Sequence, residues 1–430
     1  MKILFASTAD AGHVNPLIAI ALMAQSRGDD VVVTTGARAE DRVKAAGLRY
    51  YPRITMATRT SLPIMPSDDR ATPQQTLLEV LKHGFIDDMP AQAQTLRNAI
   101  TEEQPDIIIS DLGFLGRVAL FLDPDRPPIP LVCCGITYLS LERPDGAPTP
   151  MGLPPARNAQ DLARYAELAR ENDGAFNTPI RAYMDEKLNE LALPALPFSL
   201  STSLTMLCDA YIHPTVPAFE YDFGDLPKHI HFVGSLPLPK STSFTLPGWW
   251  REVDDGRTVI VVTQGTVAND DMSDLIEPTI ASLSDRDDLL VIVTTGGRPI
   301  TSLSHPLPSN VRAVEYVDYN ALLPKASLLI TNGGYGAVSA ALRFGIPVIA
   351  AGRSQDKAEV GARVEWSGVG IELATQHPTE EMLRSALDRI LSNPSYRDRA
   401  QSIASDIGAI DTKAEILGVI DRLVARSGSR

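Results

Sequence analysis

A histidine and an aspartate stand at the ends of two apolar stretches that we expect to be parallel strands. His13 comes soon after the stretch 2–7, and Asp111 follows the stretch 106–109. A carboxylate bonded to one imidazole nitrogen fixes the tautomer, so the other nitrogen can take a proton from a hydroxyl. Two simpler interpretations stay open: a loop histidine that caps a helix or faces water, and an aspartate that caps the helix 115–122.

A second group of residues could hold an anion. Gly333 and Gly334 stand between an apolar strand, 328–331, and a predicted helix at about 336–344. Glycines allow a close approach of the backbone to a ligand, and a helix start offers unpaired N–H groups. A polar run follows the next predicted strand, 347–351, where open parallel sheets place ligands: Gln355, Asp356 and Lys357. The pattern favours a diphosphate site, and the alternative is a tight turn without a ligand.

Alternating strands and helices must position both groups. Asn15 is predicted to cap, and Pro16 to begin, a helix that ends at Gly28, and the next strand is expected at 30–35. The alternation restarts in the second half of the chain, with strands predicted at 258–263, 289–294, 311–314 and 328–331. Two such series predict an α/β fold of two doubly wound, Rossmann-like parallel-sheet domains that face a cleft.

A proline-rich stretch marks the predicted boundary between the two domains. We expect an N-terminal domain at 1–236, a linker at 237–250, a C-terminal domain at 251–408 and a last helical segment, 409–430, able to pack back on the N-terminal domain. Two irregular stretches interrupt the first half, at 55–88, which holds a helix near 73–84, and at 144–179. Long irregular segments are often functional, so these could wall an apolar pocket or be plain solvated loops.

Composition narrows the classes of partner. The 430 residues are 44% hydrophobic and carry a net charge of −14 without a basic run, which argues against nucleic acid or an anionic membrane as the main partner. No apolar stretch reaches the length of a membrane span. The three cysteines, Cys133, Cys134 and Cys208, lack disulfide or metal spacing, so a reduced cytoplasmic location is expected.

Taken together, the motifs resemble the UDP-glycosyltransferase family of GT-B fold, of the bacterial macrolide and plant natural-product type. The resemblance covers nearly the whole chain and rests on these stretches: Gly12-His13-Val14-Asn15-Pro16, Phe232-Val233-Gly234, Pro247-Gly248-Trp249-Trp250, Val261-Val262-Thr263-Gln264-Gly265-Thr266, and Tyr316 through Asn332-Gly333-Gly334 and Gly345-Ile346-Pro347 to Asp356-Lys357. Members of this family glycosylate small lipophilic acceptors.

The resemblance also implies roles for single residues. His13 would be the general base and Asp111 its partner, and Tyr316 would stack on the nucleobase unless it is a core tyrosine. Asp356 would accept hydrogen bonds from sugar hydroxyls. The implied donor-binding residues are Thr266, Tyr316, Asn332, Gly333, Gly334, Gly336, Ala337, Asp356 and Lys357.

Four positions depart from the family pattern. Asn332 replaces a histidine, Ala337 a serine or threonine, Ala340 a glutamate on the ribose, and Lys357 a glutamine. Asn332 can donate an N–H to a phosphate but carries no charge. Lys357 either restores a positive charge for the donor or pairs with Asp356 or Glu359.

The leading interpretation is an inverting transferase that moves a sugar from a UDP-sugar to a hydroxyl of a small lipophilic acceptor. Glucose is the leading candidate for this sugar. No metal and no cofactor beyond this co-substrate is expected, since N–H groups and a helix dipole can hold the departing diphosphate. The alternatives are a dTDP-deoxysugar transferase, an impaired GT-B auxiliary or binding protein, and an epimerase or lipid-linked transferase. Expected partners are the acceptor and the nucleotide sugar alone, in a monomer or homodimer.

Overall fold

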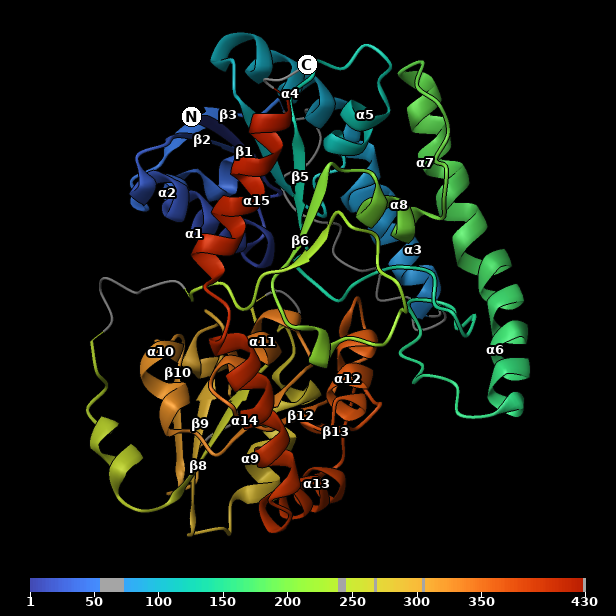
Figure 1. Ribbon diagram of the computed structural model, residues 1–430. Coiled ribbons are helices and arrows are strands. Elements are labelled where there is room, and N and C mark those ends of the chain that lie inside the picture. Colours follow the sequence, from blue (N-terminus) through green and yellow to red (C-terminus); the bar gives the residue numbers. More distant parts are fainter. Residues whose placement is uncertain (55–72, 239–244, 267–268, 304–305, 428–430) are drawn as a thin grey trace.

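Two α/β lobes make up the molecule, one below the other in Figure 1. The computed structural model describes residues 1–54, 73–238, 245–266, 269–303 and 306–427. The N-terminal lobe holds a seven-stranded sheet of order β3-β2-β1-β4-β5-β6-β7, and the C-terminal lobe a six-stranded sheet of order β10-β9-β8-β11-β12-β13. Neighbouring strands pair in parallel throughout both sheets, which confirms the two predicted doubly wound halves.

The strands are short and mostly apolar. Those of the N-terminal sheet are β1 (Lys2–Ala6), β2 (Asp30–Thr35), β3 (Arg49–Pro52), β4 (Ile107–Asp111), β5 (Leu131–Cys134), β6 (Ala210–His213) and β7 (Ile230–Phe232). Those of the C-terminal sheet are β8 (Thr258–Thr263), β9 (Leu289–Thr294), β10 (Val311–Val314), β11 (Leu328–Thr331), β12 (Val348–Ala350) and β13 (Gly370–Glu372). Central strands such as β9 are buried along their whole length, as expected where helices cover both faces.

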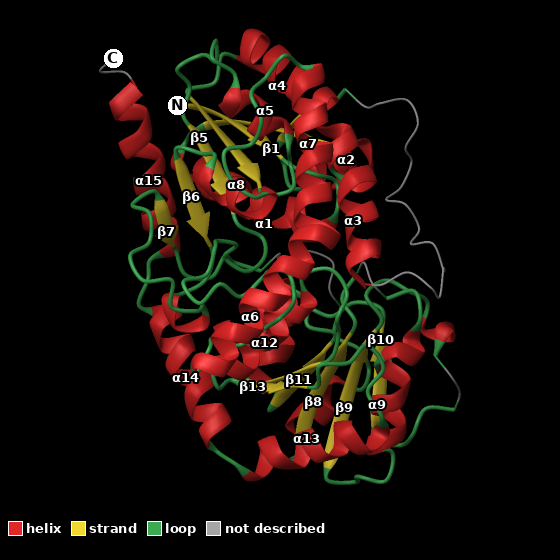
Figure 2. Ribbon diagram, turned by 90° about the vertical axis from the view of Figure 1, so that its right-hand side faces the viewer, coloured by secondary structure: helices red, strands yellow, loops and turns green. Residues whose placement is uncertain are grey.

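Helices cover both faces of each sheet, as Figure 2 shows from the side. In the N-terminal half they are α1 (Ala11–Arg27), α2 (Glu40–Ala45), α3 (Pro73–Gly84), α4 (Met89–Glu103), α5 (Gly116–Leu122), α6 (Ala159–Asn172), α7 (Thr178–Glu190) and α8 (Leu200–Met206). The remaining helices are α9 (Ile276–Leu283), α10 (Tyr319–Leu322), α11 (Tyr335–Arg343), α12 (Lys357–Trp366), α13 (Glu380–Ser392), α14 (Ser395–Gly408) and α15 (Thr412–Ser427).

Helix α1 begins five residues earlier than the cap signals predicted, at Ala11 instead of Pro16. The carbonyl oxygen of Asp10 accepts hydrogen bonds from the N–H groups of His13 and Val14, both at 2.9 Å, and so closes the first turn. Asn15 is therefore not a helix cap, and Pro16 lies inside the helix. As a consequence, His13 belongs to the rigid first turn of α1 instead of a loop.

The irregular stretch predicted at 144–179 is wrong for most of its length. Helix α6 occupies its middle and passes through a π-helical turn, Asp173–Asn177, into α7. In α6 only Tyr165 and Asn172 are buried, so the helix packs little of its surface against the rest of the lobe. Of the other irregular stretch, residues 55–72 lie outside the described part, and helix α3 at 73–84 is confirmed.

The last helix crosses back from the C-terminal lobe to the N-terminal lobe. In Figure 1, α14 lies on the lower lobe and α15 on the upper one, beside α1. Ile416, Leu417 and Ile420 of α15 share a buried cluster with Leu17 and Ala21 of α1. The chain thus has two crossings, although residues 239–244 of the predicted linker lie outside the described residues.

A buried ion cluster joins the lobes at α12. The Arg363 guanidinium donates to Glu220 at 2.5 Å and to Glu359 at 2.9 Å, and all three side chains are nearly inaccessible to solvent. Glu220 lies between β6 and β7, and Glu359 also accepts from the N–H groups of Met151 and Gly152. Glu359 is thus committed to Arg363 and two backbone N–H groups, and the expected pairing of Lys357 with Glu359 does not occur.

Candidate active site

A cavity of about 1220 Å³ lies between the two lobes. Its C-terminal wall is more polar than its N-terminal wall and is built by the loops that follow β8, β10, β11 and β12. Apolar side chains dominate the N-terminal wall, among them Leu77, Leu81, Phe85, Leu112, Ile136, Ile180, Leu200 and Leu204. The lining comes from the carboxyl ends of the strands, the usual ligand site of doubly wound sheets.

The structure brings His13 and Asp111 together in the N-terminal wall. His13 Nδ1 lies 2.9 Å from Asp111 Oδ1, and the histidine side chain is 19% exposed while the aspartate is fully buried behind it. Asp111 also accepts from the N–H groups of Thr8 at 2.8 Å and Gly113 at 2.6 Å. The aspartate therefore fixes the ring, leaving Nε2 as the nitrogen for a substrate.

The same contacts set the protonation of the pair. Burial alone would lower the pKa of His13, but the adjacent Asp111 carboxylate, with smaller contributions from Asp10 and Asp356, raises it above its ordinary 6.5. Burial would raise the pKa of Asp111, yet His13 and the two N–H donors hold it below its ordinary 3.8. Asp111 thus stays ionised, and His13 becomes a stronger base than free imidazole.

Gly113 leaves room for the histidine ring. A Cβ at this position would lie 2.7 Å from His13 Cε1 and 2.9 Å from Nδ1, closer than van der Waals contact. Phe85 packs beside the same position, 3.0 Å from such a Cβ, and its ring centroid lies 5.7 Å from that of His13. The ring is thus held by packing as well as by Asp111.

Gly113→Ala is expected to lower turnover about tenfold while nucleotide binding stays unchanged. The added methyl would push the ring from its position, and a displacement of 1 Å in a reacting group can cost about a hundredfold. Gly174→Ala is the matched control, because nothing lies within 4 Å of a Cβ there. Equal turnover of both variants in a transfer assay would contradict the importance of this ring position.

On the opposite wall, the turn between β11 and α11 has the expected form. Gly333 adopts φ 84°, a left-handed conformation that favours glycine, and α11 begins at Tyr335 without a side-chain cap. Asn332 Nδ2 donates to the carbonyl of Gln264 at 2.5 Å, and Asn332 Oδ1 accepts from Gly334 N at 3.3 Å. Asn332 therefore ties two loops together, and the residues of the first turn of α11 line the cavity.

Tyr316 is not a core residue. Its side chain is 64% exposed, lines the cavity and packs over Gly297, where a Cβ would meet the phenol oxygen at 2.2 Å. Glycine at 297 thus allows the ring to lie flat against the backbone. An exposed aromatic face at the mouth of a cavity can stack on a planar ligand.

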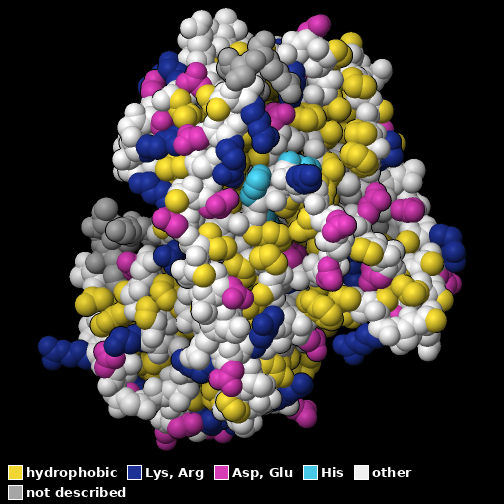
Figure 3. Space-filling model, in the orientation of Figure 1, with side chains coloured by type: hydrophobic (Ala, Val, Ile, Leu, Met, Phe, Trp, Pro, Cys, Tyr) yellow, Lys and Arg dark blue, Asp and Glu magenta, His cyan; other side chains and the backbone are white. Residues whose placement is uncertain are grey.

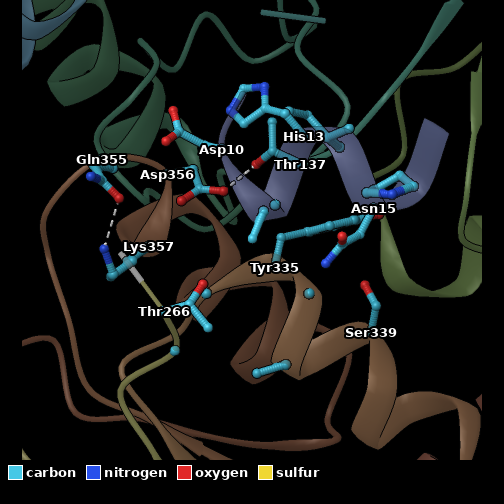
Figure 4. A pocket seen from close by; sticks show the side chains of 18 of the residues that line it. Asp10, His13, Asn15, Thr137, Thr266, Tyr335, Ser339, Gln355, Asp356 and Lys357 are labelled. Atoms are coloured by element: carbon cyan, nitrogen blue, oxygen red, sulfur yellow. Dashed lines mark hydrogen bonds between the residues drawn. The ribbon is translucent and has the colours of Figure 1, made fainter. Parts of the chain in front are cut away.

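Asp356 lies where the two lobes face each other. Its Oδ2 accepts a hydrogen bond from Thr137 Oγ1 at 2.5 Å, and Figure 4 shows this pair between His13 above and Thr266 below. Thr137 follows β5, which ends at Cys134. After β5 the chain leaves the sheet, and Tyr138 packs into the core of the other lobe.

Most of the donor-site residues predicted from the sequence line this one cavity. They are Thr266, Tyr316, Asn332, Gly334, Gly336, Ala337, Asp356 and Lys357, with His13 opposite; Gly333 shapes the turn and Asp111 lies behind His13. Sequence reasoning missed Asp10, Thr137 and Ser339, which also line it. Asp10 and Thr137 had a recognisable signal, as polar residues shortly after the buried strands β1 and β5.

Two features of the described ranges bear on the kind of site. No group of three or more His, Cys, Asp or Glu side chains there is arranged to hold a metal ion. None of the helices in those ranges is both long and apolar enough to cross a membrane.

Comparison with known proteins identifies relatives along the entire chain. Residues 277–423 match the family model of the erythromycin biosynthesis protein CIII-like C-terminal domain. The chain is 34% identical to 4'-demethylrebeccamycin synthase of Lentzea aerocolonigenes, over 98% of this chain and 99% of that protein. It is 31% identical to UDP-glycosyltransferase 2 of Phaeomoniella chlamydospora, over 96% and 94%.

Solved structures share the whole architecture. The glycotransferase of kitacinnamycin superposes with a TM-score of 0.73 at 18% identity, covering 98% of this chain and 99% of that one. The calicheamicin glycosyltransferase CalG4 gives 0.72 at 20% identity, with 99% and 98% covered. Glycosyltransferase VinC in complex with DTDP gives 0.65 at 19% identity, with 99% and 100% covered.

Proposed function

Since the chain belongs to the UDP-glycosyltransferase family, within its natural-product type of GT-B fold, we propose that it transfers a hexose to a hydroxyl of a small lipophilic acceptor. Glucose is the leading candidate for the hexose, and the configuration at its anomeric carbon is inverted. The family makes it a glycosyltransferase that uses a nucleotide sugar. The acceptor class, the sugar and the stereochemistry are our proposal.

One observation carries this proposal: the His13 and Asp111 pair lies across a single cavity from the start of α11. In our mechanism, His13 Nε2 takes the proton of the acceptor hydroxyl while Asp111 stabilises the imidazolium. The acceptor oxygen attacks the anomeric carbon as the bond to the diphosphate breaks. The N–H groups of the first turn of α11 and the helix dipole receive the departing charge.

The apolar wall supports a lipophilic acceptor. The leucines and Phe85 around His13 exclude water from the reacting hydroxyl and offer little to a polar sugar or peptide. The surface gives no sign of a nucleic-acid partner on the face drawn in Figure 3, where basic and acidic side chains are intermixed.

Two donor bases remain candidates. The relatives include UDP-glycosyltransferase 2, whereas VinC was solved in complex with DTDP. The exposed Tyr316 suits either base, because stacking depends on a planar face. Ala340 is 1% exposed and cannot bind a ribose, but Ser339 beside it lines the cavity and offers a hydroxyl for that contact.

The test is an incubation of the purified protein with UDP-glucose and a panel of phenols, followed by mass spectrometry. We expect acceptor masses to increase by one hexose. A parallel thermal-shift series with UDP and dTDP identifies the base, because a ligand at about 100 times its Kd adds roughly 2.7 kcal/mol of stability. Stabilisation by a nucleotide without product from any sugar donor would instead favour the auxiliary binding protein.

A further inference from the structure

Lys357 places an ammonium group in the cavity wall without an ionic partner. The side chain is 3% exposed, and Nζ donates to two neutral oxygens, Ser354 Oγ at 3.1 Å and Gln355 Oε1 at 3.0 Å. Within the described residues it forms no ion pair. Buried lysines are almost always paired, because an uncompensated charge is costly away from water.

The nearby carboxylates are committed elsewhere. Asp356 accepts from Thr137, and Glu359 pairs with Arg363. Asp274 pairs with His377 and accepts from Gln376. The protein itself therefore leaves the charge of Lys357 without a direct counter-ion.

The surrounding backbone is shaped to hold this lysine in place. A Cβ at Gly352 would lie 2.9 Å from Lys357 Cδ, and one at Gly333 would lie 3.5 Å from Lys357 Cβ. The side chain thus passes beside the same glycine turn that opens α11. Gln355, which accepts from Nζ, has φ 57°, an uncommon conformation for a residue other than glycine.

We propose that Lys357 is an anion site, and that it binds a negatively charged oxygen of the nucleotide sugar, on the diphosphate or on a carboxylate of the sugar. The inference rests on the proposed function, since it assigns the ligand of the same cavity. It gives the donor a cation at Lys357, beside the turn that holds the uncharged Asn332. Figure 4 shows Lys357 and Gln355 on the wall that also holds Thr266.

The test is calorimetric titration of UDP, dTDP, UDP-glucose and UDP-glucuronic acid into wild type, Lys357→Gln and Lys357→Met. Loss of a charge-assisted hydrogen bond should raise Kd about ten- to a hundredfold. The control is Lys325→Gln, which removes the same charge from an exposed pair with Asp254 outside the cavity. Its Kd values should equal those of wild type.

Each outcome has a distinct meaning. If the Lys357 variants bind all four ligands more weakly, Lys357 binds the diphosphate. If they bind only UDP-glucuronic acid more weakly, Lys357 binds the sugar carboxylate. Unchanged Kd values, or an equal loss in Lys325→Gln, would overturn the site. Wild type that binds none of the nucleotides would refute the proposed function, and this inference with it.

Thermal unfolding without nucleotide provides a second readout. Lys357→Met removes an uncompensated buried charge and keeps the packing volume. The thermal unfolding midpoint of this variant should therefore not fall below that of wild type. A large fall in both variants would make Lys357 a structural residue and overturn the proposal.

Discussion

Replacement of His13 by alanine is expected to reduce sugar transfer about 10²- to 10⁴-fold, with the fold and nucleotide binding intact. His13 is the only described histidine that lines the cavity, and its Nδ1 is occupied by Asp111. Without it, the acceptor hydroxyl has no base in place. Turnover with a phenolic acceptor, circular dichroism and UDP titration measure the three properties separately.

The chain offers a matched control for this variant. His83 and Asp87 form a second pair, with Nδ1 2.8 Å from Oδ2, but neither residue lines the cavity. His83→Ala should keep near-normal turnover. If His13→Ala also kept near-normal turnover, the general-base mechanism would be refuted.

The pH profile provides an independent check on His13. Because the pKa of His13 is raised above 6.5, the base is protonated and inactive at acidic pH, and activity should rise with pH through a value above 6.5. This acid limb should disappear from the residual activity of His13→Ala. A limb that persists there would belong to another group.

Asp111→Asn is expected to have the second largest effect, approaching that of His13→Ala. An amide cannot stabilise the imidazolium, and it can hold the wrong tautomer of His13. It retains one oxygen for Thr8 N or Gly113 N, so we expect a smaller loss of stability than of activity. Measurements of kcat and of the thermal midpoint separate the two.

Two further measurements distinguish a positioning role for Asp111 from a merely structural one. Without the carboxylate, burial becomes the main influence on the His13 pKa, so the acid limb should move to lower pH. The His13→Ala, Asp111→Asn double variant should be no slower than His13→Ala alone. Additive losses, or an unmoved limb, would separate the two residues.

Much of the fold was predictable because its central strands are continuous apolar runs. The strands β8, β9, β10 and β11 occur at the predicted residues. The start of α1 was not predictable, because Asn15 and Pro16 are residues typical of a helix start. The helix in fact begins earlier, where the carbonyl oxygen of Asp10 accepts the first hydrogen bonds. A mostly exposed helix such as α6 gives a weaker signal than a buried strand, because few of its side chains have to be apolar.

The site residues could be predicted where they stand at the ends of strands that could themselves be predicted. His13 comes soon after β1 and Asp111 ends β4, and these two strands pair, so the contact between the two side chains follows from sheet order. The contacts of Thr137 with Asp356, and of Arg363 with Glu220, depend on how two lobes pack. No local pattern encodes such packing, and the neutral hydrogen-bond partners of Lys357 Nζ could not be predicted either.

The return of α15 to the N-terminal lobe also determines where two such genes can be recombined to exchange sugar preference. A hybrid that takes everything after the interlobe connection from a relative would set a foreign α15 against the native α1, where this chain has the pair of Arg27 with Asp421. Chimaeras with a second crossover between α14 and α15 would inherit both hydrophobic cores intact.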